Sequence, residues 1–263
     1  MSRLRAKCPV CKTYTAVALG PDYECHACGR EFHAGLVRVP QAWGDGGEAM
    51  AEAAWLELPF PETAVVEAES LEEQSLALAA DLPERPLILG GCCCSHAGAV
   101  EGLAARQGRI SLVWLDAHGD LNTPESSPSG NTWGMPLRML LDSGAVREED
   151  TVLIGARELD PPEEEFLAQS GVGRGVERIG AALDGTGCTY VALDADVVEP
   201  SELSVFMPEP AGLPLVELER ILRDVAARTN VLGVGFTGLT FEPSNVPLLG
   251  RLASALGLSS APD

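Results

Sequence analysis

Beyond about residue 38, short apolar runs alternate with helical stretches, and this alternation constrains the fold more than any other feature. The runs expected to form strands are Pro86–Leu89, Ile110–Leu115, Thr151–Ile154, Thr189–Leu193 and Val231–Val234. The stretches expected to form helices are Leu71–Ala80, Val100–Arg106, Pro162–Gln169 and Leu215–Ala227. Continuous apolar strands that alternate with helices are typical of a parallel sheet covered on both faces. The sequence therefore predicts an α/β domain.

Acidic side chains follow two of these strands directly. Asp116, His118 and Asp120 come after the strand that ends at residue 115, and Asp194 and Asp196 come after the strand that ends at residue 193. Ligands of such sheets bind beyond the carboxyl ends of the strands, where nearby carboxylates repel one another unless a cation is bound. A single Asp-x-Asp is often only a polar turn. Two clusters at neighbouring strand ends instead favour one or two ions of Mn²⁺, Fe²⁺, Co²⁺ or Zn²⁺.

Two Cys-x-x-Cys pairs lie near the N-terminus, formed by Cys8 with Cys11 and by Cys25 with Cys28. Each pair presents two sulfurs on a tight turn, and two such turns complete a tetrahedral Zn²⁺ site. Unligated cysteines and a redox-active pair are the alternatives, although redox motifs of this kind occur singly. We expect residues 1–35 to form a zinc ribbon, with strands at 13–17 and 23–24, and residues 36–263 to form the α/β domain.

The net charge and the N-terminal sequence limit the partners of the chain. The chain carries 18 Lys and Arg against 39 Asp and Glu, a formal charge of −21 at pH 7. This charge argues against nucleic acid, so we expect the ribbon to serve docking or oligomer contact. No apolar run approaches the ~20 residues that span a bilayer. Because no apolar signal-peptide core precedes Cys8, we expect a cytoplasmic protein with reduced cysteines and no membrane contact.

Three longer motifs resemble those of the arginase/agmatinase family, and the similarity runs from about Val37 to Pro243. The segment from Asp116 to Asn122 resembles the DAHxDxN motif, residues 129–136 resemble the SGNxHGxP loop, and residues 194–200 resemble the DxDxxDP motif. The resemblance implies a three-layer α-β-α fold around a parallel sheet. It also implies a binuclear site, usually of Mn²⁺, whose bridging hydroxide attacks the carbon of a guanidinium or similar group.

The resemblance further implies six metal ligands, with Asp116 and Asp194 as the bridging ones. These ligands are Asp116, His118, Asp120, Asp194, Asp196 and Cys93. Asp120 would also orient the attacking hydroxide. Cys93 replaces the His of a GGDHS motif, and its softer thiolate favours Zn²⁺ or Fe²⁺ over Mn²⁺. Alternatively, Cys92–Cys94 are small residues in a tight turn, and His96 is either a further ligand or a residue that packs its helix.

Two other departures from the family pattern concern catalysis. Trp133 replaces the His credited with proton shuttling in the SGNxHG loop, and indole cannot exchange a proton near neutral pH. The guanidinium-binding Glu of the family lies three residues before a Pro on the last strand, and alignment on Pro243 places Thr240 there. Glu242 would lie on the same strand face and can partly substitute, so it is a candidate catalytic residue.

The outer loop resembles the part of arginase that binds an amino-acid substrate. The residues that match positions holding the α-carboxylate are Asn122, Ser127, Ser129 and Asn131, and Asp160 matches the acid near the α-amino group. The alternative is that these are ordinary turn and cap residues. Both interpretations remain open.

Two functional hypotheses follow. The first is a hydrolase of a non-peptide C–N bond in a small guanidino or amidino, amino-acid-like substrate, with Mn, Zn or Fe at the strand ends. The second is a catalytically impaired relative that keeps the metal as a binding or assembly module. Trp133 and Thr240 favour the second hypothesis, whereas a retained acid cluster, which costs stability without metal, favours the first. The family resemblance also leads us to expect a homo-oligomer.

Overall fold

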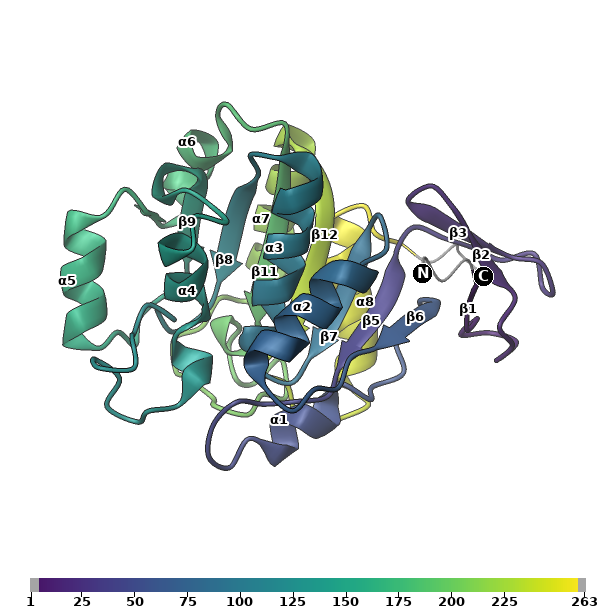
Figure 1. Cartoon of the computed structure of the whole chain (residues 1–263), viewed down its shortest axis with the longest axis horizontal. Coiled ribbons are helices and arrows are strands. Elements are labelled where there is room, and N and C mark those ends of the chain that lie inside the picture. The colour runs from purple at the N-terminus through teal and green to yellow at the C-terminus, as the bar shows by residue number, and fades with distance from the viewer. Residues whose placement is uncertain (1–4, 260–263) are drawn as a thin grey trace.

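The computed structural model describes residues 5–259, which contain one large and one small sheet (Figure 1). The strands of the large sheet are β5 (Gly35–Val39), β6 (Glu62–Val65), β7 (Pro86–Gly90), β8 (Ser111–Leu115), β9 (Thr151–Ile154), β10 (Gly173–Arg174), β11 (Cys188–Asp194) and β12 (Asn230–Thr237). Their order is β10-β9-β8-β11-β12-β7-β5-β6, and all the pairings are parallel. The predicted parallel sheet is confirmed.

Helices cover both faces of this sheet. They are α1 (Glu48–Ala53), α2 (Leu71–Asp81), α3 (Cys94–Gln107), α4 (Pro136–Asp142), α5 (Pro161–Gln169), α6 (Ile179–Leu183), α7 (Leu215–Arg228) and α8 (Asn245–Ala255). Figure 1 shows α2, α3 and α4 in front of the sheet and α7 and α8 behind it. Alternate residues of β8 join separate cores on the two faces, Leu112 and Trp114 on the α3 side and Val113 and Leu115 on the α7 side. The molecule is therefore a three-layer α-β-α structure, as predicted.

The expected elements agree with the observed ones in most places. The predicted strands correspond to β7, β8, β9, β11 and β12, and three of the four predicted helices correspond to α2, α5 and α7. The helix expected over 100–106 begins earlier, at Cys94. Its first turns consist of small residues, which give no apolar periodicity. Gly98 and Gly102 lie close to the backbone of α2, where a Cβ would meet Ser75 or Ala79.

The small sheet consists of antiparallel strands in chain order. They are β1 (Arg5–Ala6), β2 (Ala16–Leu19), β3 (Asp22–Cys25) and β4 (Glu31–Phe32). This sheet lies beside β6, the edge strand of the large sheet (Figure 1). Lys7 and Glu62 exchange backbone hydrogen bonds of 2.9 and 3.0 Å there. The boundary between residues 35 and 36 remains a prediction, and β5 begins at Gly35. Within residues 5–259, no helix is both long enough and apolar enough to cross a membrane.

Candidate metal centre

Four adjacent strands of the large sheet bring chemically active side chains together at their carboxyl ends. Asp116 follows β8, Asp194 ends β11, Thr237 ends β12, and Cys93 follows β7. A cavity of about 310 Å³ lies beyond these strand ends. It is lined by every metal ligand expected from the sequence, namely Cys93, Asp116, His118, Asp120, Asp194 and Asp196.

The ligand atoms form two groups that share Asp116. Cys93, Asp116 and Asp120 offer ligand atoms within 4.8 Å of one another, and so do Asp116, His118 and Asp196. In the second group, His118 Nδ1 lies 2.9 Å from Asp196 Oδ2 and 3.5 Å from Asp116 Oδ1. Two ligand groups joined by one carboxylate have the composition of a two-metal site.

Asp194 lies against the first of these groups. The Cys93 thiol and the Thr237 hydroxyl both donate to Asp194 Oδ2 at 3.0 Å, and the Asp196 amide donates to Asp194 Oδ1 at 3.1 Å. Gly238 adopts a φ of 68°, and a side chain at this position would overlap the Asp194 carboxylate. The carboxylate is therefore fixed beside Cys93. Its bridging of two ions remains a prediction.

The carboxylates of the centre are too close together and too buried to ionise freely. Burial and the charge of Asp196 raise the pKa of Asp194 to about 7. Burial and the charge of Asp116 raise the pKa of Asp196 to about 6 and that of Asp120 well above its usual range. Burial lowers the pKa of His118, but its hydrogen bonds to Asp116 and Asp196 and their charges outweigh this and raise it to about 12. The centre therefore favours a bound cation.

Asp120 provides the most direct indication that the centre binds a metal ion. Its Oδ2 atom is buried and has no hydrogen-bond partner among residues 5–259. A buried carboxylate oxygen without a partner is costly. Asp120 also has a φ of 53°, a conformation that non-glycine residues seldom adopt and that is found at functional sites. A divalent cation would satisfy this oxygen, and a set of carboxylates, one imidazole and one thiol fits Mn²⁺, Fe²⁺ or Zn²⁺.

His96 does not reach the centre. Its Nδ1 and Nε2 atoms each lie 3.2 Å from a hydroxyl oxygen, of Tyr190 and of Thr237 respectively. The ring is fully buried, which lowers the pKa of His96 to about 3, and it packs edge-on against Trp114. The structure thus supports the interpretation that His96 packs its helix. Through Thr237, His96 also braces Asp194.

Glu242 lies outside the site, contrary to the prediction. The last strand ends at Thr237, so Thr240 and Glu242 do not share the face of a strand. The Glu242 side chain is exposed and does not line the cavity. The Thr240 hydroxyl instead lies 2.7 Å from the Ser204 hydroxyl. Glu242 is therefore not placed to act on a substrate in this cavity.

The predicted substrate-binding residues lie at the cavity. All five line it, namely Asn122, Ser127, Ser129, Asn131 and Asp160. They also have local structural roles. Asn122 Nδ2 donates to Asp160 Oδ2 at 2.8 Å, and Asp160 forms a capping box with Glu163 at the start of α5. Ser127 accepts the Gly130 amide at 3.0 Å. Their contact with substrate remains a prediction.

Several residues in or near the cavity were not expected from the sequence. Met50, Phe206 and Met207 line it beside Trp133. Glu209 Oε1 lies 3.8 Å from His118 Nε2, on the side of the ring that faces away from Asp116. These residues precede β7 or follow β11 in loops and a short helix, and no motif spacing marks them. Only the tertiary structure brings them to the strand ends.

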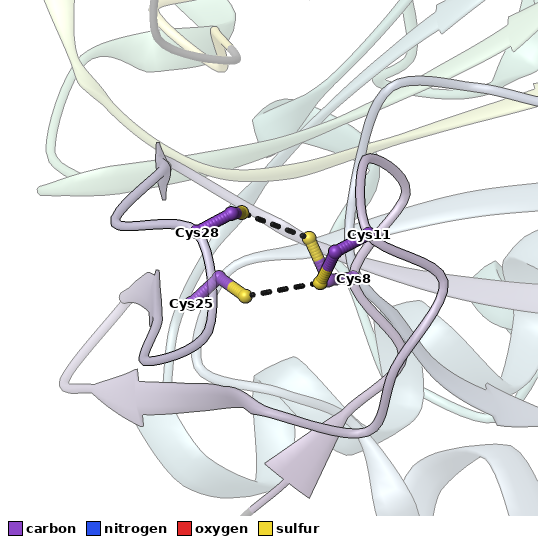
Figure 2. Close-up of side chains that lie close together, drawn as sticks. All are labelled: Cys8, Cys11, Cys25 and Cys28. Atoms are coloured by element: carbon purple, nitrogen blue, oxygen red, sulfur yellow. Dashed lines mark hydrogen bonds between the residues drawn. The ribbon is translucent and has the colours of Figure 1, made fainter.

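The four N-terminal cysteines form a second, separate cluster (Figure 2). The sulfurs of Cys11 and Cys25 are 3.5 Å apart, those of Cys8 and Cys28 are 3.8 Å apart, and all four lie within 4.8 Å of one another. A tetrahedral Zn²⁺ with bonds of about 2.3 Å requires sulfurs about 3.8 Å apart. None of the four forms a disulfide. The geometry therefore fits a single zinc ion.

The fold and the strand-end ligands define an α/β protein with a candidate binuclear metal centre. The sequence places it more narrowly. The chain belongs to the arginase family, whose family model matches residues 41–240.

Individual relatives agree with this family membership. An arginase of Staphylococcus aureus (strain COL) is 44% identical over 92 residues, which cover 31% of this chain and 30% of that protein. The chain thus spans about 30% of the length of this curated relative. The crystal structure of arginase from Bacillus cereus has a TM-score of 0.71 and 24% identity, covering 84% of this chain and 97% of its own. That of formimidoylglutamase from Bacillus subtilis has a TM-score of 0.67 and 19% identity, covering 86% and 88%. Both structures share the fold of this chain.

Proposed function

We propose that this chain is a metal-dependent hydrolase that cleaves a non-peptide C–N bond in a small guanidino or amidino compound. The observation that carries the proposal is the pair of ligand groups that share Asp116 at the base of a cavity of about 310 Å³. A cavity of this size suits a small molecule. Membership of the arginase family supports the same chemistry, and the similar structures are an arginase and a formimidoylglutamase.

The residues of the centre would divide the work as follows. Cys93 and Asp120 would hold one ion, His118 and Asp196 the other, and Asp116 and Asp194 both. Bound there, the ions supply Lewis acidity and lower the pKa of a water molecule. The Asp120 carboxylate, whose Oδ2 has no hydrogen-bond partner among residues 5–259, would hold its ion, orient the attacking water and accept the proton of that water. Glu209 would hold the imidazole of His118 in orientation through Nε2.

A screen of metal-loaded protein tests this activity. Arginine, agmatine and other guanidino and amidino compounds are incubated with the protein, and urea and ammonia are measured. We expect hydrolysis of at least one compound, with a rate that falls about 10²–10⁴-fold in Asp120→Asn, because the amide cannot accept the proton of the water. The control is Asp142→Asn, whose exposed carboxylate only pairs with Arg138 on α4. Full metal occupancy without any product would contradict the proposal.

The second candidate function is a metal-bound module without turnover. Trp133 lines the cavity but cannot carry a proton, and Thr240 is hydrogen-bonded to Ser204 instead of lining the cavity. The same screen separates the two functions. In the binding module, metal removal would lower the thermal midpoint and abolish ligand binding, while no compound would be hydrolysed.

We further propose that Cys8, Cys11, Cys25 and Cys28 hold one structural Zn²⁺, independent of the strand-end ions. Metal analysis should find this zinc in the purified protein and show its loss in Cys25→Ser, which removes one of four thiolates. The strand-end metal should remain. Cys188→Ser, at a half-buried position outside both clusters, is the control. A zinc-free protein whose four thiols titrate freely would rule this site out.

A further inference from the structure

One wall of the cavity is apolar and has no part in the proposed chemistry. This apolar wall consists of Met50, Trp133, Phe206 and Met207. The rings of Trp133 and Phe206 meet edge-on, with centroids 6.4 Å apart and planes at 75°. Both rings are half-buried, and they pack against a small core that contains Met50. Each side chain thus contacts both the small core and the cavity.

The surrounding loops are built to hold Trp133 in this place. A Cβ at Gly44 would overlap the six-membered ring of the indole, and a Cβ at Gly47 would lie 3.0 Å from it. The loop that carries Trp133 is tied to the glycine loop by hydrogen bonds from Thr132 N to Trp43 O at 3.0 Å and from Asp45 N to Asn131 Oδ1 at 2.9 Å. The indole therefore occupies a fitted position between two loops.

Some of the polar groups that line the rest of the cavity are already engaged within the protein. Both ends of the Asn122 amide are engaged, with Asp160 Oδ2 at 2.8 Å and with the Ser126 hydroxyl at 2.8 Å. Asn131 Oδ1 is used by Asp45 N. Charge nevertheless favours a cation, because four carboxylates and the Cys93 thiolate outweigh the four positive charges of two divalent ions.

Resting on the proposed function, we propose that the cavity selects a guanidinium or amidinium cation whose substituent is a large apolar group such as an aromatic ring. Trp133 and Phe206 contact that substituent, and the acidic centre contacts the cation. The wall buries apolar surface, and aromatic rings gain further from edge-on or offset contacts. An amino-acid arm, as in arginine, would lose its hydration against this wall without an equivalent return.

Two guanidines that differ only in their substituent test this selectivity. Benzylguanidine and methylguanidine are titrated by calorimetry into the metal-loaded full chain. We expect benzylguanidine to bind about 10–100-fold more tightly, which corresponds to burial of one phenyl ring. Trp133→Ala should reduce this ratio about tenfold. Trp55→Ala should keep it, because Trp55 is 46% exposed and lies outside the cavity.

The outcomes separate this inference from the proposed hydrolysis. Equal affinities for the two guanidines, or no binding of either, would overturn the selectivity regardless of any variant. If Trp133→Ala does not fold, Phe206→Ala provides the same comparison. Urea release is measured in parallel. A retained affinity ratio without hydrolysis would contradict only the hydrolase, whereas equal hydrolysis of methylguanidine, arginine and benzylguanidine would contradict only the selectivity.

Discussion

Cys93 is the residue that most clearly sets this chain apart from the family pattern it otherwise follows. Its side chain is 5% exposed, and its sulfur lies 3.0 Å from Asp194 Oδ2 and 3.6 Å from Asp116 Oδ2. Burial and the charge of Asp194 raise the pKa of the Cys93 thiol well above its usual range. A bound ion must therefore displace this proton. The resulting soft thiolate binds Zn²⁺ or Fe²⁺ more strongly than Mn²⁺.

Replacement of this thiol should change which metal the centre prefers. In Cys93→His, we expect the ratio of bound Mn to bound Zn to rise after exposure to equimolar Mn²⁺ and Zn²⁺, because imidazole is a harder ligand than thiolate. Elemental analysis of the strand-end site gives this ratio once the ribbon zinc is subtracted. Cys188→Ser serves as the control. An unchanged ratio would show that Cys93 is not a ligand.

At the scale of elements, the metal centre depends on the close contact between α3 and α2. Cys93 immediately precedes α3, so any shift of that helix moves a ligand. The contact is possible because Gly98 lacks a side chain, and a Cβ there would lie 2.6 Å from the Ser75 carbonyl oxygen. Gly250 in α8 offers a comparison, since a Cβ there would meet no atom of residues 5–259 within 4 Å.

The same exchange at these two glycines should have opposite effects on stability. Gly250→Ala should raise the free energy of unfolding by up to about 1 kcal/mol through helix propensity. Gly98→Ala should lower it by about 1–3 kcal/mol, because the forced separation of α3 from α2 outweighs that gain. Urea unfolding of both variants measures the difference. Stabilisation by Gly98→Ala would mean that the two helices can move apart freely.

The sequence was sufficient to predict those site residues that directly follow a regular strand. Asp116 and Asp194 each follow a continuous apolar strand. Because neighbouring parallel strands have their carboxyl ends on the same side of the sheet, the proximity of these two carboxylates could be predicted. Glu242 was placed wrongly because the end of β12 at Thr237 depends on tertiary contacts and not on the apolar pattern. Phe206 was missed because its loop is fixed by a long-range bond from its amide to the Gly238 carbonyl at 2.8 Å.

At the scale of the whole molecule, the four-cysteine segment contacts the edge strand β6 of the large sheet through a backbone bridge at Glu62. An uncovered edge strand offers unpaired backbone groups to other chains. Here Lys7 pairs with Glu62 at the start of β6, and His33 N donates to Ser259 O at 2.9 Å near the other end of the chain. The segment therefore contacts the edge strand of the large domain and the chain near Ser259. It lies at the opposite end of the sheet from α5 (Figure 1).

Loss of the proposed zinc should expose this edge without unfolding the large domain. In Cys25→Ser, we expect faster amide hydrogen exchange over residues 5–34 and at Glu62, because a short segment without its metal cannot keep its own core. Exchange in β8 and β11 should stay slow, since both strands lie inside the sheet. An exposed β6 should also promote more concentration-dependent association than the unaltered protein shows, measured by sedimentation velocity. Cys188→Ser should show neither effect. Global loss of protection in Cys25→Ser would mean that the cysteine segment and the α/β domain fold as one unit, and unchanged protection at Glu62 would mean that the segment does not cover the edge.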